Sequence, residues 1–397
     1  MTPRGRRSTT GWLTGLLLVV SLSSSSPAFA SWQMREFLIL YIYGFPAEQV
    51  AGRLTESSAR GIAAAHYNTV MCATAELELV AKAGLRCLLI GWSRGAPDYV
   101  GEAVSPAVAS TLAYNPAVWG YYVTDEPDNK NTKRGTVFQQ LAERVAAYRM
   151  ADPNHVAYIN MTAAEGPFLA TYMEVVKPDL LSYDEYRWWW GLDSDWFRAL
   201  NSHRDAALKA GVPLLIWIES NTNEKRFNAH LSPPEDNATK IRWSVYTSLA
   251  YGVKGVQWFL GSTHEDVAKL NAELLAMGPT LIRLESQHVF HTSAVPREGQ
   301  GLPESSWYFT NAPDLLIGEF VDPADSNASY FLIANKSIDH DTDAAFEIRR
   351  REVSVVEEVN KESVGRMALP MERKAGATWV RLHLSAGDGR LIRVVAQ

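Results

Sequence analysis

The feature that most limits the possible folds of this chain is a regular alternation between residue 36 and about residue 284. Apolar, β-rich runs alternate there with stretches that carry apolar residues at helical spacing. The β-rich runs are continuously apolar, which is typical of strands that are buried on both faces of a parallel sheet. They span residues 37–45, 67–74, 85–92, 118–124, 155–162, 180–186, 213–220 and 255–260.

The stretches between these runs indicate helices. Residues 135–150 and 195–210 have clear helical spacing, and the second stretch stops at Gly211, a common residue just beyond a helix end. Eight β-then-α units in roughly 250 residues match the number and length of a closed barrel. An open doubly wound sheet is the rival fold, but no Gly-rich phosphate loop follows the first run. We therefore predict an α/β fold, a (β/α)8 TIM barrel, for residues 31–284.

The pattern changes after about residue 285. Short, turn-bounded β runs follow one another at residues 315–320, 329–334, 344–349, 378–384 and 391–395. Such spacing without intervening helices indicates an antiparallel β-sandwich. We predict a C-terminal antiparallel β-sandwich domain over residues 285–397, with structural support of the barrel as its role.

The first thirty residues have the organisation of a secretory signal peptide. A basic start with Arg4, Arg6 and Arg7 precedes an apolar run at 12–22 and a small-x-small cleavage position at 28–30. The apolar run is too short to span a membrane, and no later stretch is long enough. We expect a secreted or periplasmic protein that starts at Ser31 and has no integral membrane segment in its mature chain.

The charge balance narrows the possible partners. Removal of residues 1–30 takes away three of the 38 basic side chains and none of the 44 acidic ones, so the formal net charge falls from −6 to −9. An acidic surface argues against nucleic acid and against anionic membranes as partners. It does not identify a substrate.

The chain has two cysteines, Cys72 and Cys87. An exported protein could join them in a disulfide. Both fall within predicted parallel strands, where a thiol is usually a small apolar core residue. We therefore expect two core thiols rather than a disulfide.

Two glutamates stand at strand ends, where the reactive side chains of (β/α) barrels lie. Glu126 follows the fourth run in the string Asp125-Glu126-Pro127, and Glu219 closes the seventh run. Glycoside hydrolysis needs a pair of carboxyl groups, one as acid and one as nucleophile or base. The alternative for each residue is a purely structural role, as a helix cap or an ion-pair partner.

This pattern resembles the clan A retaining glycoside hydrolases over about residues 36–284. In that clan the acid/base glutamate follows the fourth strand in an Asn-Glu-Pro-like string, and the nucleophile ends the seventh strand. The resemblance implies that Glu126 is the acid/base and that Glu219 is the ionised nucleophile. Asp125 departs from the clan because an asparagine there donates to the sugar 2-hydroxyl, whereas an ionised aspartate only accepts. The departure leaves room for an unusual substrate.

The resemblance and the strand ends also indicate substrate-binding side chains. Trp258 matches the tryptophan that floors the sugar site of the clan, and Tyr183 or Tyr186 matches the aromatic residue that hydrogen-bonds the nucleophile. The run Trp188–Trp190 is either a sugar-stacking wall, with at least one ring at the barrel mouth, or packing between barrel loops. The predicted substrate-binding residues are Asp125, Tyr183, Asp184, Tyr186, Trp92, Trp188, Trp217, Asn221 and Trp258.

Three functional interpretations follow. The first is a retaining glycoside hydrolase that acts on a polysaccharide or oligosaccharide, and the second is a catalytically inactive, glycan-binding barrel. The third is a different barrel enzyme, such as a metal-dependent hydrolase or a lyase, which would need histidines at strand ends. His66, His203 and His230 are scattered instead, so we expect no metal site and no cofactor. The sequence favours the first interpretation.

Overall fold

The computed structural model describes residues 32–42, 54–90, 104–127, 134–163, 165–190, 193–223, 233–350 and 352–396. Residues Trp32–Gln397 form one compact unit. The predicted signal peptide and Trp92 lie outside the described residues. The boundary that we predict near residue 284 therefore concerns two parts of a single unit.

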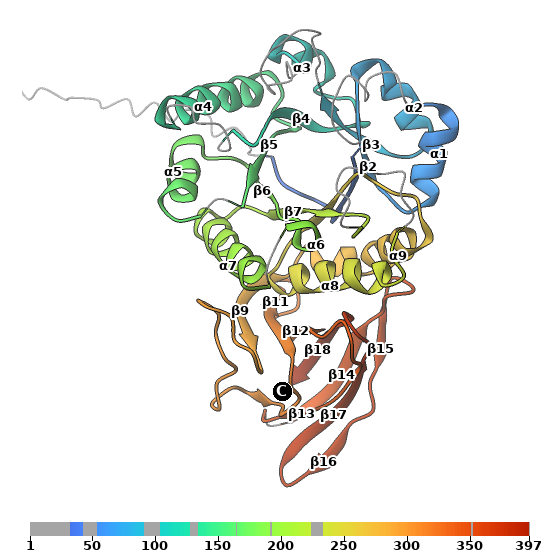
Figure 1. Ribbon diagram of the computed structural model, residues 1–397, viewed down its shortest axis with the longest axis vertical. Helices are drawn as coiled ribbons and strands as arrows, with labels where there is room; N and C mark the ends of the chain where they lie inside the picture. The colour runs from blue at the N-terminus through green and yellow to red at the C-terminus, as the bar shows by residue number, and fades with distance from the viewer. Residues whose placement is uncertain are drawn as a thin grey trace, which may run out of the picture. The chain divides into compact units, whose positions relative to one another are not determined.

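Eight parallel strands close into a barrel (Figure 1). Each strand pairs with the next along the chain, and β8 pairs with β1 through Leu38 opposite Gly255 and Tyr41 opposite Trp258. The predicted TIM barrel is thus confirmed, strand by strand. The strands are β1 (Leu38–Tyr41), β2 (Thr69–Cys72), β3 (Arg86–Ile90), β4 (Val118–Asp125), β5 (Val156–Thr162), β6 (Leu181–Asp184), β7 (Leu214–Glu219) and β8 (Gly255–Phe259).

Helices surround the strands (Figure 1). The helical stretches predicted at 135–150 and 195–210 are confirmed as α4 and α7. The helices are α1 (Glu56–Ala64), α2 (Leu77–Lys82) after the 3-10 turn η2 (Thr74–Glu76), α3 (Pro106–Leu112), α4 (Arg134–Ala151), α5 (Pro167–Val176), α6 (Arg187–Trp190), α7 (Asp193–Ala210), α8 (Asn237–Ala250) and α9 (Glu265–Leu281).

Side chains alternate along each barrel strand between the interior and the surrounding helices. In β7 every residue is buried, but Leu215 and Trp217 belong to the interior cluster, whereas Ile216 and Ile218 pack with the helices. This two-sided burial explains why the strands read as continuously apolar. It also decides which predicted site residues can reach the barrel interior.

The two cysteines form a disulfide between β2 and β3. Cys72 and Cys87 lie on neighbouring strands with their Cα atoms 5.7 Å apart, within the range that a disulfide requires. Both side chains face the helix layer, because they are two positions apart in the parallel register. The expectation of two core thiols is therefore wrong.

The residues after the barrel form two antiparallel sheets, which confirms the predicted sandwich. One sheet has the order β10-β13-β17-β16, and the other has the order β15-β14-β18-β12-β11-β9. The five predicted strands correspond to β11 (Leu315–Val321), β12 (Ala328–Asn335), β13 (Thr342–Ile348), β17 (Ala377–Leu384) and β18 (Gly389–Ala396). The prediction missed β9 (Glu285–His291), β10 (Tyr308–Phe309), β14 (Val353–Val359), β15 (Arg366–Ala368) and β16 (Glu372–Lys374).

Helix α8 packs against both the barrel and the sandwich. It contacts β7 on one side and β11, β12 and β18 on the other, so the two layers share this helix. Gly318 of β11 lies directly against the backbone of Ala250, the last residue of α8. A side chain at position 318 would collide with the carbonyl oxygen of Ala250.

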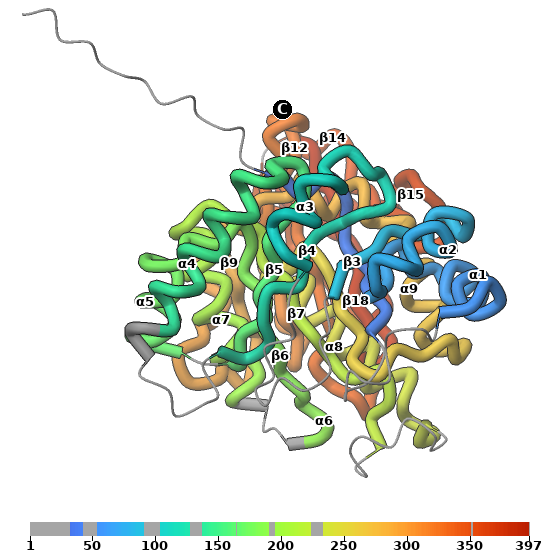
Figure 2. Tube along the Cα trace, turned by 90° about the horizontal axis from the view of Figure 1, so that it is seen from above, coloured from blue at the N-terminus to red at the C-terminus, as the bar shows by residue number. Residues whose placement is uncertain are grey.

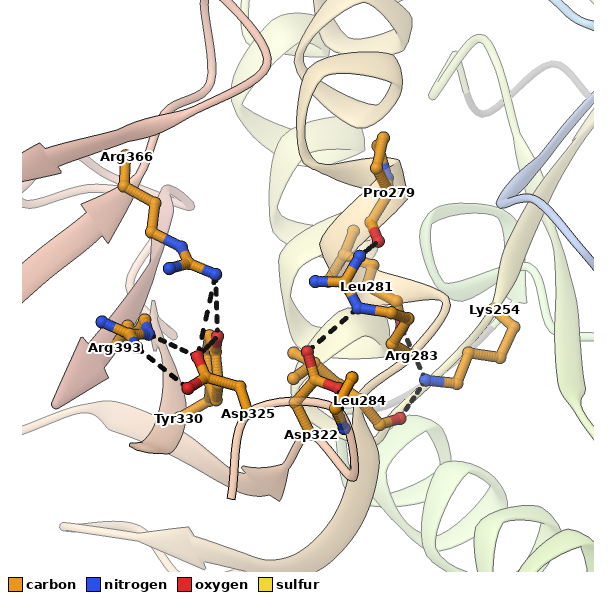
Figure 3. Close-up of polar contacts among 11 residues, drawn as sticks. Lys254, Pro279, Leu281, Arg283, Leu284, Asp322, Asp325, Tyr330, Arg366 and Arg393 are labelled. Atoms are coloured by element: carbon orange, nitrogen blue, oxygen red, sulfur yellow. Dashed lines mark hydrogen bonds and ion pairs between the residues drawn. The ribbon is translucent and has the colours of Figure 1, made fainter. Parts of the chain in front are cut away.

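Polar contacts fix the chain where it leaves the barrel (Figure 3). The Lys254 ammonium, just before β8, donates to the carbonyl oxygens of Leu281 and Leu284 on either side of the turn between α9 and β9. Arg283 in that turn donates to Asp322 at the end of β11, with Nε 3.0 Å from Oδ2. Burial lowers the pKa of Lys254 to about 8.

In the described part of the chain, no helix combines the length and the apolar character that a membrane crossing requires.

The contact at Gly318 yields a stability prediction. We expect Gly318→Ala to lower the free energy of unfolding by about 1–3 kcal/mol, because the added methyl group meets a backbone atom that cannot turn away. Urea denaturation of the mature protein measures this change. The matched control is Gly61→Ala in α1, where nothing lies within 4 Å of the added methyl. There alanine should be neutral or stabilise by up to about 1 kcal/mol. Equal effects of the two changes would contradict the direct packing of β11 on α8.

Candidate active site

Carboxyl groups gather at the end of the barrel where the parallel strands terminate. Asp125 ends β4, Asp184 ends β6 and Glu219 ends β7, while Glu126 directly follows β4. The carboxyl ends of parallel barrel strands share one rim, so all four groups lie at the same mouth. Asp125 and Glu126 are partly exposed, whereas Asp184 and Glu219 are buried.

The amide of Asn160 on β5 joins two of these carboxylates. Its Nδ2 donates to Oδ1 of Asp184 at 2.9 Å and to Oδ1 of Asp125 at 3.2 Å. The hydroxyl of Tyr122 also donates to Asp125 Oδ1, at 2.7 Å. Two carboxylates held by one amide stay close together and keep a fixed orientation at the mouth.

A second polar layer lies deeper in the barrel. Ser182 Oγ donates to Asn160 Oδ1 at 3.1 Å and accepts from Gln257 Nε2 at 2.9 Å. Tyr158 donates to Gln257 Oε1 at 2.5 Å, and the indole of Trp217 donates to the Tyr158 hydroxyl. All five side chains are almost completely buried, so each bond avoids the cost of an unpaired polar group. This network links β5 through β8 and supports the carboxylates above it.

Glu219 is 1% exposed. Its Oε1 accepts a hydrogen bond from the backbone N–H of Trp188 at 2.6 Å, and its Oε2 is buried without a hydrogen-bond partner among the described residues. Burial raises the pKa of Glu219 to about 8, although the amide of Trp188 acts in the opposite direction. The resemblance implies an ionised Glu219, but at neutral pH the free protein favours its neutral form.

Tyr186 lies near all four carboxyl groups. Burial raises the pKa of the Tyr186 hydroxyl, and the charges of Asp184, Asp125, Glu126 and Glu219 raise it further. All four groups therefore lie within electrostatic range of one phenol. The ring of Tyr186 belongs to the interior cluster of the barrel.

Glu126 adopts an unusual backbone conformation. Its φ angle is 39°, in the left-handed region that glycine favours, and its N–H donates to Asn160 O at 2.9 Å. Such a conformation costs on the order of 1–3 kcal/mol for a non-glycine residue and concentrates at functional sites. The chain therefore turns sharply at the end of β4, and the hydrogen bond to β5 holds that turn.

Two predicted site residues face the surrounding helices instead of the barrel interior. The ring of Tyr183 stacks on His203 of α7 with centroids 3.8 Å apart, and Trp258 donates to Asn271 of α9 at 2.8 Å. Both residues are fully buried against the helices. The prediction that Tyr183 and Trp258 bind substrate is therefore wrong, because each is one position out of phase with the inward residues of its strand.

The tryptophans after β6 divide between two environments. Trp188 packs against the helix layer, and its indole donates to Ser244 Oγ of α8 at 2.9 Å, which matches packing between barrel elements, the alternative to a sugar-stacking wall. The ring of Trp189 instead joins the interior cluster, 5.2 Å from Tyr186 and 5.8 Å from Phe259. It is 8% exposed. The side chain of Trp190 lies outside the described residues.

The remaining predicted residues take supporting positions. The ring of Trp217 lies in the barrel interior, beneath the rim, and is 1% exposed. Asn221 follows β7, and its carbonyl oxygen accepts a hydrogen bond from the Trp189 indole at 3.0 Å. Asn221 Oδ1 accepts from the N–H of Asn223 at 3.0 Å. Trp92 cannot be assigned, because it lies outside the described residues.

The sequence interpretation missed the polar network that joins the carboxylates. Asn160, Ser182 and Gln257 each interrupt an otherwise apolar run. A polar side chain in a strand that is buried on both faces must find a partner, and the interior of the barrel is the place where several strands converge. That interruption was the signal in the sequence. The described residues contain no group of three or more His, Cys, Asp or Glu side chains that could hold a metal ion.

Known proteins resemble the chain only at low similarity. No family model matches the chain, and no curated protein matches it in sequence. Among solved structures, it is similar to a glycoside hydrolase family 30 subfamily 8 xylanase from Clostridium acetobutylicum. The two chains are 11% identical, the similarity covers 91% of this chain and 97% of that chain, and the TM-score is 0.46.

Two further solved structures are similar to this chain. A family 39 glycoside hydrolase from Bacteroides cellulosilyticus has 11% identity over 90% of this chain and 80% of that chain, with a TM-score of 0.46. A family 44 endoglucanase from Clostridium thermocellum has 12% identity over 85% and 83%, with a TM-score of 0.41. Similarity at this level concerns the fold alone, and the function has to be argued from the site.

The burial of Glu219 predicts a specific pH dependence of stability. Between pH 4.5 and about pH 8 the unfolded chain releases the proton of Glu219 while the folded chain keeps it, so stability falls as the pH rises. The full loss is on the order of 4–5 kcal/mol and is complete above pH 8. We expect Glu219→Gln to remove this loss. The free energy of unfolding of the variant should therefore increase relative to that of the wild type from pH 5 to pH 8.

Urea denaturation at several pH values measures this difference, and Glu362→Gln on an exposed turn of the sandwich is the control. A constant difference between Glu219→Gln and the wild type at all pH values would contradict the raised pKa.

Proposed function

We propose that this protein is an exported glycoside hydrolase that cleaves O-glycosidic bonds of a polysaccharide or oligosaccharide with Glu126 and Glu219, with retention of configuration. The proposal is supported by the positions of the two glutamates at the carboxyl ends of β4 and β7 in a closed parallel barrel, where the charges of both raise the pKa of the Tyr186 hydroxyl. The predicted signal peptide supports export.

The two glutamates can divide the chemistry as the clan A resemblance implies. Glu126 is partly exposed at the mouth and can give a proton to the leaving oxygen of a bound glycoside. Glu219 attacks the anomeric carbon as a carboxylate, the bond to the leaving oxygen breaks, and a glycosyl-enzyme forms. Water, deprotonated by Glu126, then displaces Glu219 from the sugar. Each glutamate returns to its starting state.

The surrounding groups suit a sugar with many hydroxyl groups. Asp125 and Asp184 can accept hydrogen bonds from hydroxyls, and Asn160 holds both in place. The rings of Tyr186 and Trp189 supply apolar surface beside the carboxylates. We propose that Asp125 binds a hydroxyl donor of the substrate at the position where the clan uses an asparagine.

One observation favours a second candidate, a glycan-binding barrel without activity. Glu219 is almost completely buried, and burial favours its neutral form, which is a poor nucleophile. A binding protein would tolerate a neutral glutamate at this position. Turnover measurements with variants of both glutamates distinguish the two candidates.

The Glu pair predicts a characteristic pattern of variant activities. Glu219→Ala should abolish turnover, because it removes the carboxylate that we propose forms the glycosyl-enzyme. Glu126→Ala should retain activity on nitrophenyl glycosides, whose leaving groups need no acid, and added azide should accelerate its second step. NMR of the first product should find retained configuration, while Glu362→Gln keeps full activity as the control. Inverted product would overturn the retaining mechanism, and full activity of Glu219→Ala would overturn the pair.

The raised pKa of Glu219 predicts the pH profile of the reaction. On an activated nitrophenyl glycoside the acid is not needed, so kcat/KM should report the ionisation of the nucleophile alone. We expect kcat/KM to rise about tenfold per pH unit and to level off near pH 8. If kcat/KM instead falls above pH 8, Glu219 is the acid and Glu126 is the nucleophile.

A further inference from the structure

The carboxyl group of Glu219 is oriented by a backbone group rather than by a tyrosine. The N–H of Trp188 donates to Oε1 at 2.6 Å, and Oε2 has no hydrogen-bond partner in the part of the chain that the structure describes. The hydroxyl of Tyr183, which the clan resemblance offered for this purpose, lies on the other side of the barrel wall. The position of Trp188 therefore has a direct effect on the orientation of Glu219.

The indole of Trp188 is fixed to helix α8 by several contacts. Its Nε1 donates to Ser244 Oγ at 2.9 Å and to Lys240 O at 3.2 Å. Its ring meets the ring of Trp243 edge to face, with centroids 5.4 Å apart. The guanidinium carbon of Arg187 lies 4.9 Å from the ring centroid and the Lys240 ammonium lies 5.5 Å from it, close enough for cation–π attraction.

Helix α8 is itself a rigid support. Ser244 is 1% exposed, and its hydroxyl also bonds Lys240 O, one turn earlier in the same helix. Trp243 donates to Lys336 O at the end of β12, at 2.8 Å, and Arg242 donates to Ala386 O at 2.7 Å. The sandwich thus holds the helix that holds the indole. Figure 2 shows α6 at the end of β6, in continuity with the strand.

We propose that Trp188 is a positioning residue: its indole is anchored on α8 so that its backbone N–H orients the Glu219 carboxyl group. In this arrangement Oε1 is occupied by the amide, and Oε2 is the oxygen that remains for the anomeric carbon. The inference rests on the proposed function, because it assigns Trp188 a part in the reaction of Glu219. It replaces the sugar-stacking role that the Trp188–Trp190 run suggests.

The test compares two tryptophans that contact the same helix. Trp188→Phe removes the indole N–H, and Trp196→Phe is the matched control. Trp196 is fully buried on α7, donates to Thr247 Oγ1 of α8 at 3.1 Å and contacts Trp243 at 5.6 Å. Both variants therefore lose a hydrogen bond to α8 and part of a ring contact, but only Trp188 donates from its backbone to Glu219.

The two variants should differ in kinetics rather than in stability. With Trp188→Phe we expect kcat to fall about tenfold or more while KM stays within about twofold, the pattern of a lost transition-state interaction. The rise of kcat/KM should move to higher pH by about one unit, because a weaker amide contact stabilises the carboxylate less. Trp196→Phe should lower the thermal midpoint without moving the pH profile. A large rise in KM with an unmoved pH profile would instead restore the stacking role and overturn the proposal.

A second variant keeps the test valid if Trp188→Phe folds poorly. Ser244→Ala leaves the tryptophan intact and removes one of its two acceptors on α8. We expect a smaller shift of the pH profile in the same direction, and no additional shift when Ser244→Ala is combined with Trp188→Phe. Equal shifts of Ser244→Ala in both backgrounds would overturn the proposed path through the indole.

The two proposals can fail separately. The titration of Glu219 can also be followed without any substrate, through the pH-dependent stability difference from the Glu219→Gln version of each variant. If no glycoside is hydrolysed but Trp188→Phe still raises the pKa of Glu219, the proposed function fails and the positioning of Glu219 by Trp188 stands. If the wild type is active but Trp188→Phe and Trp196→Phe titrate alike, the positioning role fails alone.

Discussion

The closure of eight parallel strands into one barrel decides on which side of the wall each side chain lies. Successive residues of a strand point alternately to the interior and to the helices, so a shift of one position moves a side chain from the site to the core. In β6 the inward positions hold Ser182 and Asp184, with Tyr183 outward between them. In β8 the inward positions hold Gln257 and Phe259. The composition of the mouth follows from this alternation.

The same alternation explains which parts of the site the sequence could reveal. The number of strands, their order and the ends that carry Glu126 and Glu219 are accessible from apolar runs and from the string after the fourth run. The sequence does not reveal which residues of each strand point to the barrel interior. A run that is apolar on both faces shows no alternation of polar and apolar residues. Tyr183 and Trp258 matched the clan in sequence but occupy the outward phase. The disulfide was missed for a related reason, since only the register of β2 against β3 brings Cys72 and Cys87 together.

The sandwich contributes to the site through helix α8 rather than through residues of its own. Its strands β11 and β12 lie against α8, and the close approach at Gly318 leaves no space for a side chain. The other side of α8 holds Trp196 and Trp188 through indole hydrogen bonds to Thr247 and Ser244. With Trp188 positioning Glu219 as proposed, the sandwich supports the site by packing behind α8. The barrel and the sandwich belong to the same compact unit, Trp32–Gln397.

The burial of Glu219 disfavours its ionised form. Burial raises the pKa of Glu219 to about 8 although backbone N–H groups act in the opposite direction, because a carboxylate that is removed from water is unfavourable. Under the proposed function, a sugar in the mouth brings hydroxyl groups, and one that donates to the buried Oε2 of Glu219 supplies a hydrogen bond that the described residues do not. Each such bond favours the ionised over the neutral form of its acceptor. Under the proposed function, a bound sugar that donates to Glu219 would therefore favour the carboxylate form that the reaction needs. A binding protein is compatible with a neutral Glu219, whereas the proposed retaining mechanism requires its carboxylate form, and hydrogen bonds from the substrate are one source of the stabilisation that this form needs.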